Sequence, residues 1–176
     1  MPRVSLVEKD QAEPKVKELY QSIENHGSQL INLFKVMGHC PFIGLNFQRL
    51  GNSILRGEVL SPRLRELAIL RVGDLAGAEY EFKQHTPRAL EAGASQEQVD
   101  EIPHWASSAA FNDQERAVLQ YTDEVAQHIR AADGTFTKLQ SFLSEHEIVE
   151  LTAAIGYYSM VCRILVALQI ELEPEP

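Results

Sequence analysis

Three residues near the middle of the sequence have the types and the spacing that proton chemistry requires. Glu81 and His85 are four residues apart, so on a helix they share one face. Glu66 lies in an apolar run just before them, and a helical hairpin turning at Gly77 would let it face both. A carboxylate buried among leucines needs a partner, and a histidine is a natural one.

These positions predict a division of roles. We expect Glu66 to orient the imidazole, His85 to supply or accept a proton, and Glu81 to act as a second proton carrier. The alternative is structural and, on spacing alone, stronger, because Glu–His pairs four residues apart are common on helix surfaces.

Arginines are candidates for holding a substrate carboxylate, because a guanidinium can donate two parallel hydrogen bonds to it. Arg71 is the first choice since it sits mid-helix in an apolar run, and Arg163 and Arg63 come next. The alternative for Arg71 is a structural salt bridge to one of the glutamates. His39 lies just before an expected helix start at Pro41, where it could cap that end or line a pocket.

Metal and thiol chemistry are both disfavoured by the sequence. Glu66, Glu81 and His85 could supply three metal ligands, but no H-x-x-x-H or H-E-x-x-H pattern supports this, so we expect neither a metal nor a cofactor. Cys40 and Cys162 are the two cysteines, and no C-x-x-C occurs. We interpret both as small, buried apolar residues.

The elements that must position these residues are predicted to be helices. Apolar residues recur at helical spacing nearly everywhere, and strand-like alternation is not evident. One apolar helix should begin at Ser61-Pro62 with Ser61 as its cap, and a second should run over about residues 78–92. Capping-box patterns predict three further helix starts, at Ser95/Gln98, Asn112/Glu115 and Ser144/Glu147. We predict an all-α fold of seven or eight helices in one compact domain, residues 1–176.

Charge and hydropathy exclude several classes of partner. Sixteen Lys and Arg against 25 Asp and Glu give a net charge of −9, unfavourable for binding nucleic acid or anionic lipid. The apolar stretch over residues 148–168 contains Glu150 and Arg163, which indicates a buried helix rather than a membrane span. Apolar and aromatic residues recur along it at a heptad-like spacing and form a seam: Ile148, Leu151, Ile155, Tyr158, Cys162 and Leu165. Its apolar face is wider than one neighbour would cover, so a contact with a second subunit is the alternative. Without a signal-like apolar core near the start, we expect a cytoplasmic protein.

Residues 60–102, "LSPRLRELAILRVGDLAGAEYEFKQHTPRALEAGASQEQVDEI", resemble the carboxymuconolactone decarboxylase-like family, which also includes the AhpD alkylhydroperoxidases. The specific motifs are R-x-R-E-L beginning at Arg63, E-x-E-F-x-x-H from Glu79 to His85, and A-L-E-A-G ending at Gly93. The resemblance implies an all-α, AhpD-like fold with a family core over about residues 40–130. It also implies a homo-oligomer, either a trimer or a hexamer, acting on a small molecule.

The same resemblance separates two activities. Peroxidase members carry C-x-x-C-x-x-x-H, and alignment on His85 also matches their glutamate to Glu66 but sets Ala78 and Glu81 at the cysteine positions. The decarboxylase branch carries E-x-E-F-x-x-H and releases CO₂ from 4-carboxymuconolactone, although Tyr80 stands where a histidine is often found. We therefore predict a cofactor-free acid–base lyase. A thiol-dependent peroxidase and a non-catalytic oligomeric binding protein are the alternatives.

Overall fold

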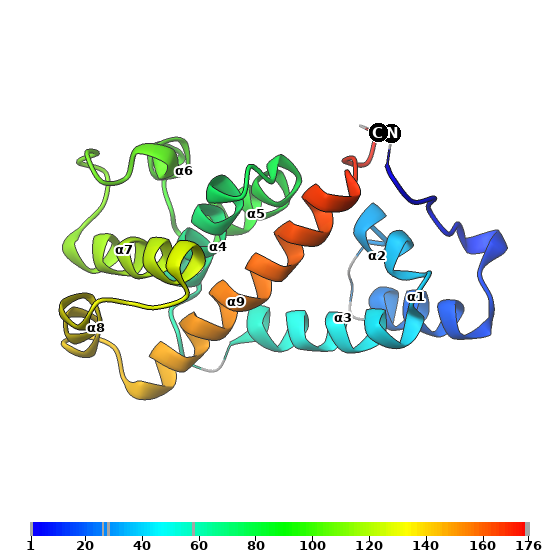
Figure 1. Ribbon diagram of the computed structural model, residues 1–176, viewed down its shortest axis with the longest axis horizontal. Helices are drawn as coiled ribbons and strands as arrows, with labels where there is room; N and C mark the ends of the chain where they lie inside the picture. The colour runs from blue at the N-terminus through cyan, green and yellow to red at the C-terminus, as the bar shows by residue number, and fades with distance from the viewer. Residues whose placement is uncertain (1, 26, 28, 58, 175–176) are drawn as a thin grey trace. The chain divides into compact units, whose positions relative to one another are not determined.

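Helices make up the regular structure of the computed structural model, which describes residues 2–25, 27, 29–57 and 59–174 (Figure 1). The all-α prediction is confirmed. The α-helices in this described part are α1 (Pro14–Asn25), α2 (Asn32–Met37), α3 (Pro41–Arg56), α4 (Pro62–Leu75), α5 (Glu79–Glu91), α6 (Gln96–Asp100), α7 (Asp113–His128), α8 (Asp133–Gln140) and α9 (Glu145–Leu168), with 3₁₀ turns at Lys9–Gln11 and Ile102–His104.

The described residues form nine α-helices, more than the seven or eight expected. Two of them, α2 and α6, are only six and five residues long. Helices of fewer than two turns show too few repeats for hydrophobic spacing to reveal them, and α6 was indicated only by its capping box.

Helix starts follow the predicted capping chemistry with one exception. Ser61 occupies the N-cap position of α4, as predicted, but its side chain makes no capping hydrogen bond in the described structure. Pro62 begins the helix without it, because proline has a helical φ and no N–H to satisfy. The three predicted capping boxes are present, at Ser95/Gln98, Asn112/Glu115 and Ser144/Glu147.

The chain divides into two compact units, and each is described by itself. The first holds the described residues up to 55 together with those from 167 onward. In this unit the C-terminal segment is tied to the start of α2, since the Asn32 side-chain amide donates to the Glu171 carbonyl at 3.0 Å. The Tyr20 hydroxyl donates to the Val7 carbonyl at 2.6 Å. The expectation of a single domain stays a prediction.

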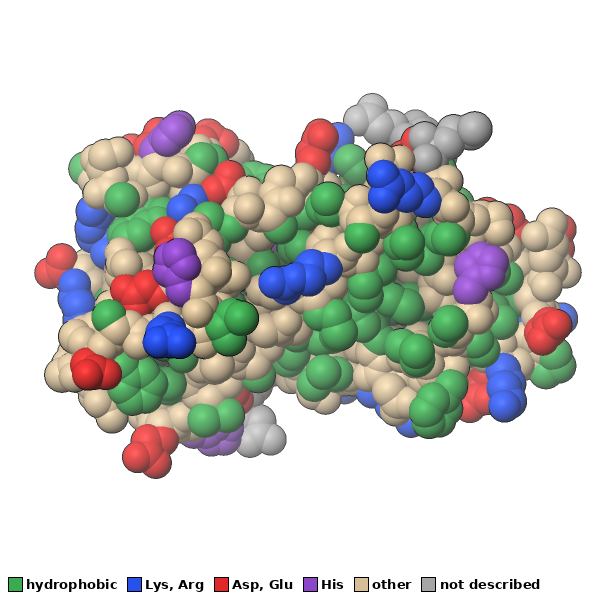
Figure 2. Space-filling model, viewed as in Figure 1, with side chains coloured by type: hydrophobic (Ala, Val, Ile, Leu, Met, Phe, Trp, Pro, Cys, Tyr) green, Lys and Arg blue, Asp and Glu red, His purple; other side chains and the backbone are tan. Residues whose placement is uncertain are grey.

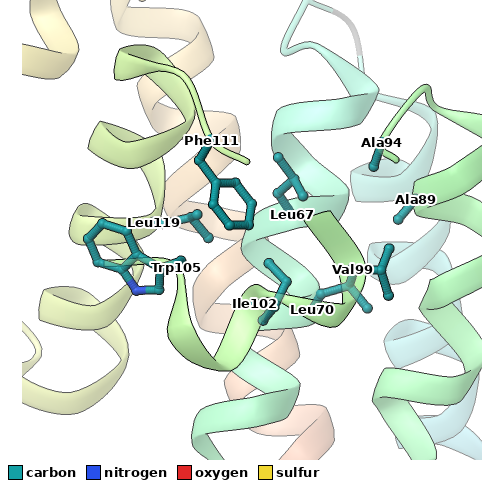
Figure 3. Packing of buried hydrophobic residues seen from close by; sticks show 9 residues of the cluster. All are labelled: Leu67, Leu70, Ala89, Ala94, Val99, Ile102, Trp105, Phe111 and Leu119. Carbon is teal, nitrogen blue, oxygen red and sulfur yellow. The ribbon is translucent and has the colours of Figure 1, made fainter. Parts of the chain in front are cut away.

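The second unit, residues 56–166, is built around α4, which packs against α5 and α7. Leu67 and Leu70 of α4 are fully buried. Figure 3 shows these two leucines between aromatic residues on one side and small residues on the other. The cluster consists of Leu67, Leu70, Ala89, Ala94, Val99, Ile102, Trp105, Phe111 and Leu119. This core fixes α4, and α4 carries the first of the predicted site residues.

Helix α9 combines a buried face with an exposed apolar one. The buried positions include Leu151, Ile155, Tyr158 and Cys162, which are members of the predicted heptad-like seam. Val149, Met160 and Val166 of this helix are exposed hydrophobic residues. Hydrophobic side chains also reach the surface of the face shown in Figure 2. By length and composition α9 would also pass for a membrane span, so the absence of membrane contact stays a prediction.

Candidate functional site

The turn between α4 and α5 brings Glu66 to the face that carries Glu81 and His85. Gly77 makes this turn with a φ of +61°, which glycine adopts without the steric cost that a side chain would bring. The two helices then run close together at Gly73. A Cβ built at this glycine would lie 3.5 Å from the Phe82 amide nitrogen and 3.7 Å from Glu81 Cβ. Close packing of this hairpin holds the acidic and imidazole groups in register.

The imidazole of His85 lies between two carboxylates. Its Nδ1 is 2.7 Å from Glu66 Oε2, and its Nε2 is 3.0 Å from Glu81 Oε1. All three side chains are buried: Glu66 is 2% exposed, Glu81 4% and His85 5%. The structure therefore brings together the three residues that spacing had singled out, and it excludes the alternative of an exposed surface pair.

This arrangement favours the protonated form of His85. Burial alone would lower the pKa of the imidazole, but hydrogen bonds to Glu66 and Glu81 and their negative charges outweigh it. The pKa of His85 rises from 6.5 to about 9. At neutral pH the ring carries a proton on each nitrogen, and each N–H donates to a carboxylate. His85 is thus a loaded proton donor with both of its protons in hydrogen bonds.

Tyr158 of α9 packs its ring against His85. The ring centroids are 4.7 Å apart and the planes meet at 80°, an edge-to-face contact. Burial, followed by the charges of Glu81 and Glu66, raises the pKa of Tyr158 well above its usual value, so its phenol stays protonated. Tyr157 lies edge-to-face against Tyr158 at 5.2 Å. Sequence analysis assigned Tyr158 only to a seam of core residues, and the regular seam gave no sign of contact with the imidazole.

Arg65 is a second residue of the site that sequence analysis missed. It is buried, and its Nε lies 3.6 Å from Glu66 Oε1, on the carboxylate whose other oxygen faces His85. The only signal for it in the sequence was its place directly before Glu66 in the R-x-R-E-L motif.

The arginines proposed for substrate binding are engaged elsewhere in the structure. Arg71 donates through Nε and Nη2 to Asp123, at 2.6 and 3.0 Å, and through Nη1 to Asp74 at 2.6 Å. Arg71 therefore forms salt bridges with aspartates, whereas the structural alternative predicted one of the glutamates as its partner. These bonds tie α4 to α7.

The remaining sequence candidates also have other contacts. Arg63 pairs with Glu115 at 2.5 Å, and the exposed Arg163 donates to the Ser159 carbonyl at 2.9 Å. His39 belongs to the other unit, where its Nε2 lies 2.8 Å from the Ser5 carbonyl oxygen. A role for any of them in substrate binding stays a prediction.

The two cysteines differ sharply in their surroundings. Cys162 on α9 is buried, and burial, together with the charge of Glu81, raises the pKa of its thiol to about 12. Cys40 is exposed, so the interpretation of it as a buried apolar residue is wrong. It directly precedes α3, where the chain places it at the surface. Neither thiol occupies α5, on which Ala78 precedes the first turn and Glu81 lies within it.

Metal binding has no geometric support in the described part of the chain, where no group of three His, Cys, Asp or Glu side chains converges. Glu66 and Glu81 bind opposite nitrogens of His85, so the three side chains do not point at a common position. Two hollows of about 460 and 320 Å³ lie beside α7 and α8, and neither is lined by the three residues.

A family model and several known proteins match this chain. Residues 44–124 match the carboxymuconolactone decarboxylase family. The uncharacterized protein YnjA of Escherichia coli K12 is 24% identical over 147 residues, which is 82% of this chain and 81% of YnjA. A structure from Agrobacterium tumefaciens, described as a putative antioxidant defence protein AhpD, is 27% identical with a TM-score of 0.69, over 74% of this chain and 90% of that one.

Two further solved structures share the fold. An uncharacterized peroxidase-related protein with an AhpD core, from Ralstonia eutropha JMP134, has a TM-score of 0.83 at 12% identity and covers 98% of this chain and 92% of its own. A cysteine-to-alanine variant of the debrominase Bmp8, bound to 2,3,4-tribromopyrrole, has a TM-score of 0.79 at 21% identity and covers 98% and 94%.

Proposed function

Because the chain belongs to the carboxymuconolactone decarboxylase-like, or AhpD-like, superfamily, we propose that it is a cofactor-free acid–base enzyme of the decarboxylase type. Its substrate would be a small carboxylated lactone or a related metabolite of aromatic catabolism. One observation carries the proposal: a buried imidazolium, His85, is held between the carboxylates of Glu66 and Glu81. Such a group supplies a proton without any thiol.

The proposed reaction balances with one proton from the enzyme. The bond from carbon to the leaving carboxylate breaks, its electron pair spreads into the adjoining unsaturated system as a dienolate, and CO₂ departs. The carbon skeleton then takes up one proton. His85 holds that proton at Nε2, which faces Glu81 Oε1 at 3.0 Å. Glu81 would pass it to the substrate, and water would restore it after release of product.

Glu66 has the positioning role in this scheme. Its bond to Nδ1 fixes the orientation of the ring and stabilises the protonated imidazole. Tyr158 restricts the same ring from its edge. The pair keeps Nε2 directed at Glu81 throughout the cycle.

Thiol-dependent peroxide reduction is the second candidate, since two relatives are described as AhpD-like or peroxidase-related. That chemistry needs a thiolate nucleophile. Cys162 is buried and its pKa of about 12 keeps it protonated at neutral pH, and Ala78 and Glu81 stand at the motif's cysteine positions. These residues support acid–base chemistry over peroxide reduction.

We also propose that the protein is a homo-oligomer, a trimer or a hexamer, without nucleic-acid or membrane partners. An exposed stripe of α9 supports this, because small and apolar side chains follow one another there at helical spacing: Val149, Ala153, Gly156 and Met160. Light scattering coupled to gel filtration should give three or six chains per particle. A particle of one chain would contradict the proposal.

Turnover of 4-carboxymuconolactone, followed by CO₂ release, tests the proposed activity. His85→Gln should lower kcat by about a hundredfold or more, which is the usual contribution of a general acid. The control is His128→Gln, which alters an exposed histidine at the end of α7. Equal turnover by His85→Gln and the unaltered protein would refute the mechanism.

A second assay tests the peroxidase alternative. Reduction of an organic hydroperoxide with a dithiol donor is expected to be absent. Peroxide turnover that is lost only in Cys162→Ala would favour the thiol mechanism instead.

A further inference from the structure

Arg65 is a buried cation that the proton steps do not use. It lies in α4 and is 6% exposed. Its Nε is shielded from solvent and has no hydrogen-bond partner among the described residues. The carboxylate of Glu66 is 3.6 Å away, which is near enough for charge attraction but too far for a good hydrogen bond. This N–H donor is therefore left unused.

The other arginines of the same helix are anchored. Arg71 forks onto Asp123 through two nitrogens and reaches Asp74 with a third. Arg63 also has an unpaired Nε, but its Nη2 donates to Gln98 and pairs with Glu115, and its side chain is 38% exposed. Arg65 thus combines deep burial with an unsatisfied donor, a costly state unless a ligand completes it.

The nearest carboxylate does not use the free donor of Arg65. Glu66 directs Oε2 at His85 Nδ1, at 2.7 Å, and its Oε1 stays 3.6 Å from Arg65 Nε. A guanidinium has five donors in a planar fork that matches a carboxylate. An added carboxylate would engage the unused donor, and it would stand one side chain away from the imidazole.

We propose that Arg65 binds a carboxylate group of the substrate, and specifically one that is kept through the reaction. A retained carboxylate stays charged in substrate, dienolate and product, so the cation holds the molecule beside Glu81 and His85 throughout. A carboxylate that leaves as neutral CO₂ would lose that attraction as its bond broke. The inference rests on the proposed function and narrows its substrates to molecules with a second acidic group.

Binding of a simple carboxylate tests the role of Arg65 without a reaction. The probe is benzoate, with benzamide as a neutral molecule of the same shape, each titrated by calorimetry at pH 7. The protein should bind benzoate and not benzamide. Arg65→Met should weaken benzoate binding by about tenfold or more, as expected for loss of a charged hydrogen bond. The control is Lys83→Gln, which removes an exposed cation from α5 and should leave binding unchanged.

A second variant covers the case in which Arg65→Met fails to fold. Arg65→Lys keeps the positive charge but lacks the planar fork, so it should fold and still bind benzoate more weakly than the unaltered protein. Circular dichroism establishes folding for both. Equal benzoate affinity in the unaltered protein and in a folded Arg65 variant, or no preference for benzoate over benzamide, would overturn the inference.

Turnover separates this inference from the proposed function. With 4-carboxymuconolactone, loss of activity in His85→Gln with an unchanged KM in Arg65→Lys would overturn the carboxylate site and leave the acid–base mechanism standing. Benzoate binding that depends on Arg65, in a protein that releases no CO₂, would overturn the decarboxylase proposal and leave the carboxylate site standing.

Discussion

Raising the pH from 6.5 to 9 is expected to destabilise the protein through His85. The pKa of this buried imidazole is 6.5 in the unfolded chain and about 9 in the folded one. Protons therefore bind the folded state more tightly, and the resulting stability is fully present below pH 6.5 and is lost as the pH rises through 9. A paired carboxylate shows the opposite dependence, because its contribution to stability is lost as the pH falls.

The size of the effect follows from the two pKa values. Each difference of one in pKa corresponds to about 1.4 kcal/mol, so the free energy of unfolding should fall by about 3 kcal/mol across this interval. The total stability of a domain is about 5–15 kcal/mol, so the loss is readily measured. Urea unfolding followed by circular dichroism at pH 6.5, 7.5, 8.3 and 9 provides the free energies.

The control for this experiment is His85→Gln, which removes the titrating ring. It should show only a small loss, even though it is less stable at pH 6.5. That small loss comes from the thiol of Cys162, whose pKa is 9.0 in the unfolded chain and about 12 in the folded one, and it is the same in both proteins. The reasoning is refuted if the unaltered protein shows no loss of stability, or if His85→Gln shows the same loss.

Three further changes test other parts of the structure. A thiol reagent at pH 8 should label only Cys40 in the native protein and also Cys162 in urea, and rapid native labelling of both would contradict the burial of Cys162. Gly73→Ala should raise the free energy of unfolding by up to about 1 kcal/mol, because alanine favours the helix and its Cβ would meet the nearest atom at 3.5 Å; a lower urea midpoint would argue against this. Arg71→Met should cost about 1–3 kcal/mol, because Asp123 would lose its guanidinium partner and keep only the hydrogen bond from Trp105 Nε1; a raised KM without loss of stability would instead restore Arg71 as a substrate-binding residue.

Local chemistry explains why much of the fold was predictable. The two residues of a capping box lie three positions apart in the sequence, so the start of a helix such as α7 could be predicted from Asn112 and Glu115. The glycine at 77 marked the turn between α4 and α5, and the spacing of Glu81 and His85 put both on one face of α5. In each case the residues that determine the local structure lie within a few positions of the structure they produce.

Long-range contacts explain what could not be predicted. Arg71 pairs with Asp123, which lies 52 residues further along the chain, and no local pattern connects them. Tyr158 reaches His85 from a helix whose spacing revealed only that it was buried. Arg65 shares its helix with two other arginines. Only the packing of the folded chain shows that Arg65 is the one buried beside Glu66 with an unpaired Nε.

Nuclear magnetic resonance of the His85 ring nitrogens tests the central claim most directly. In ¹⁵N-labelled protein, with His85→Gln used to assign the signals, both nitrogens should be protonated at pH 7 and should titrate near pH 9. Replacing both partners, as Glu66→Gln with Glu81→Gln, should bring that titration below 6.5, because burial then acts alone. A His85 ring that is neutral at pH 7 in the unaltered protein would contradict the account.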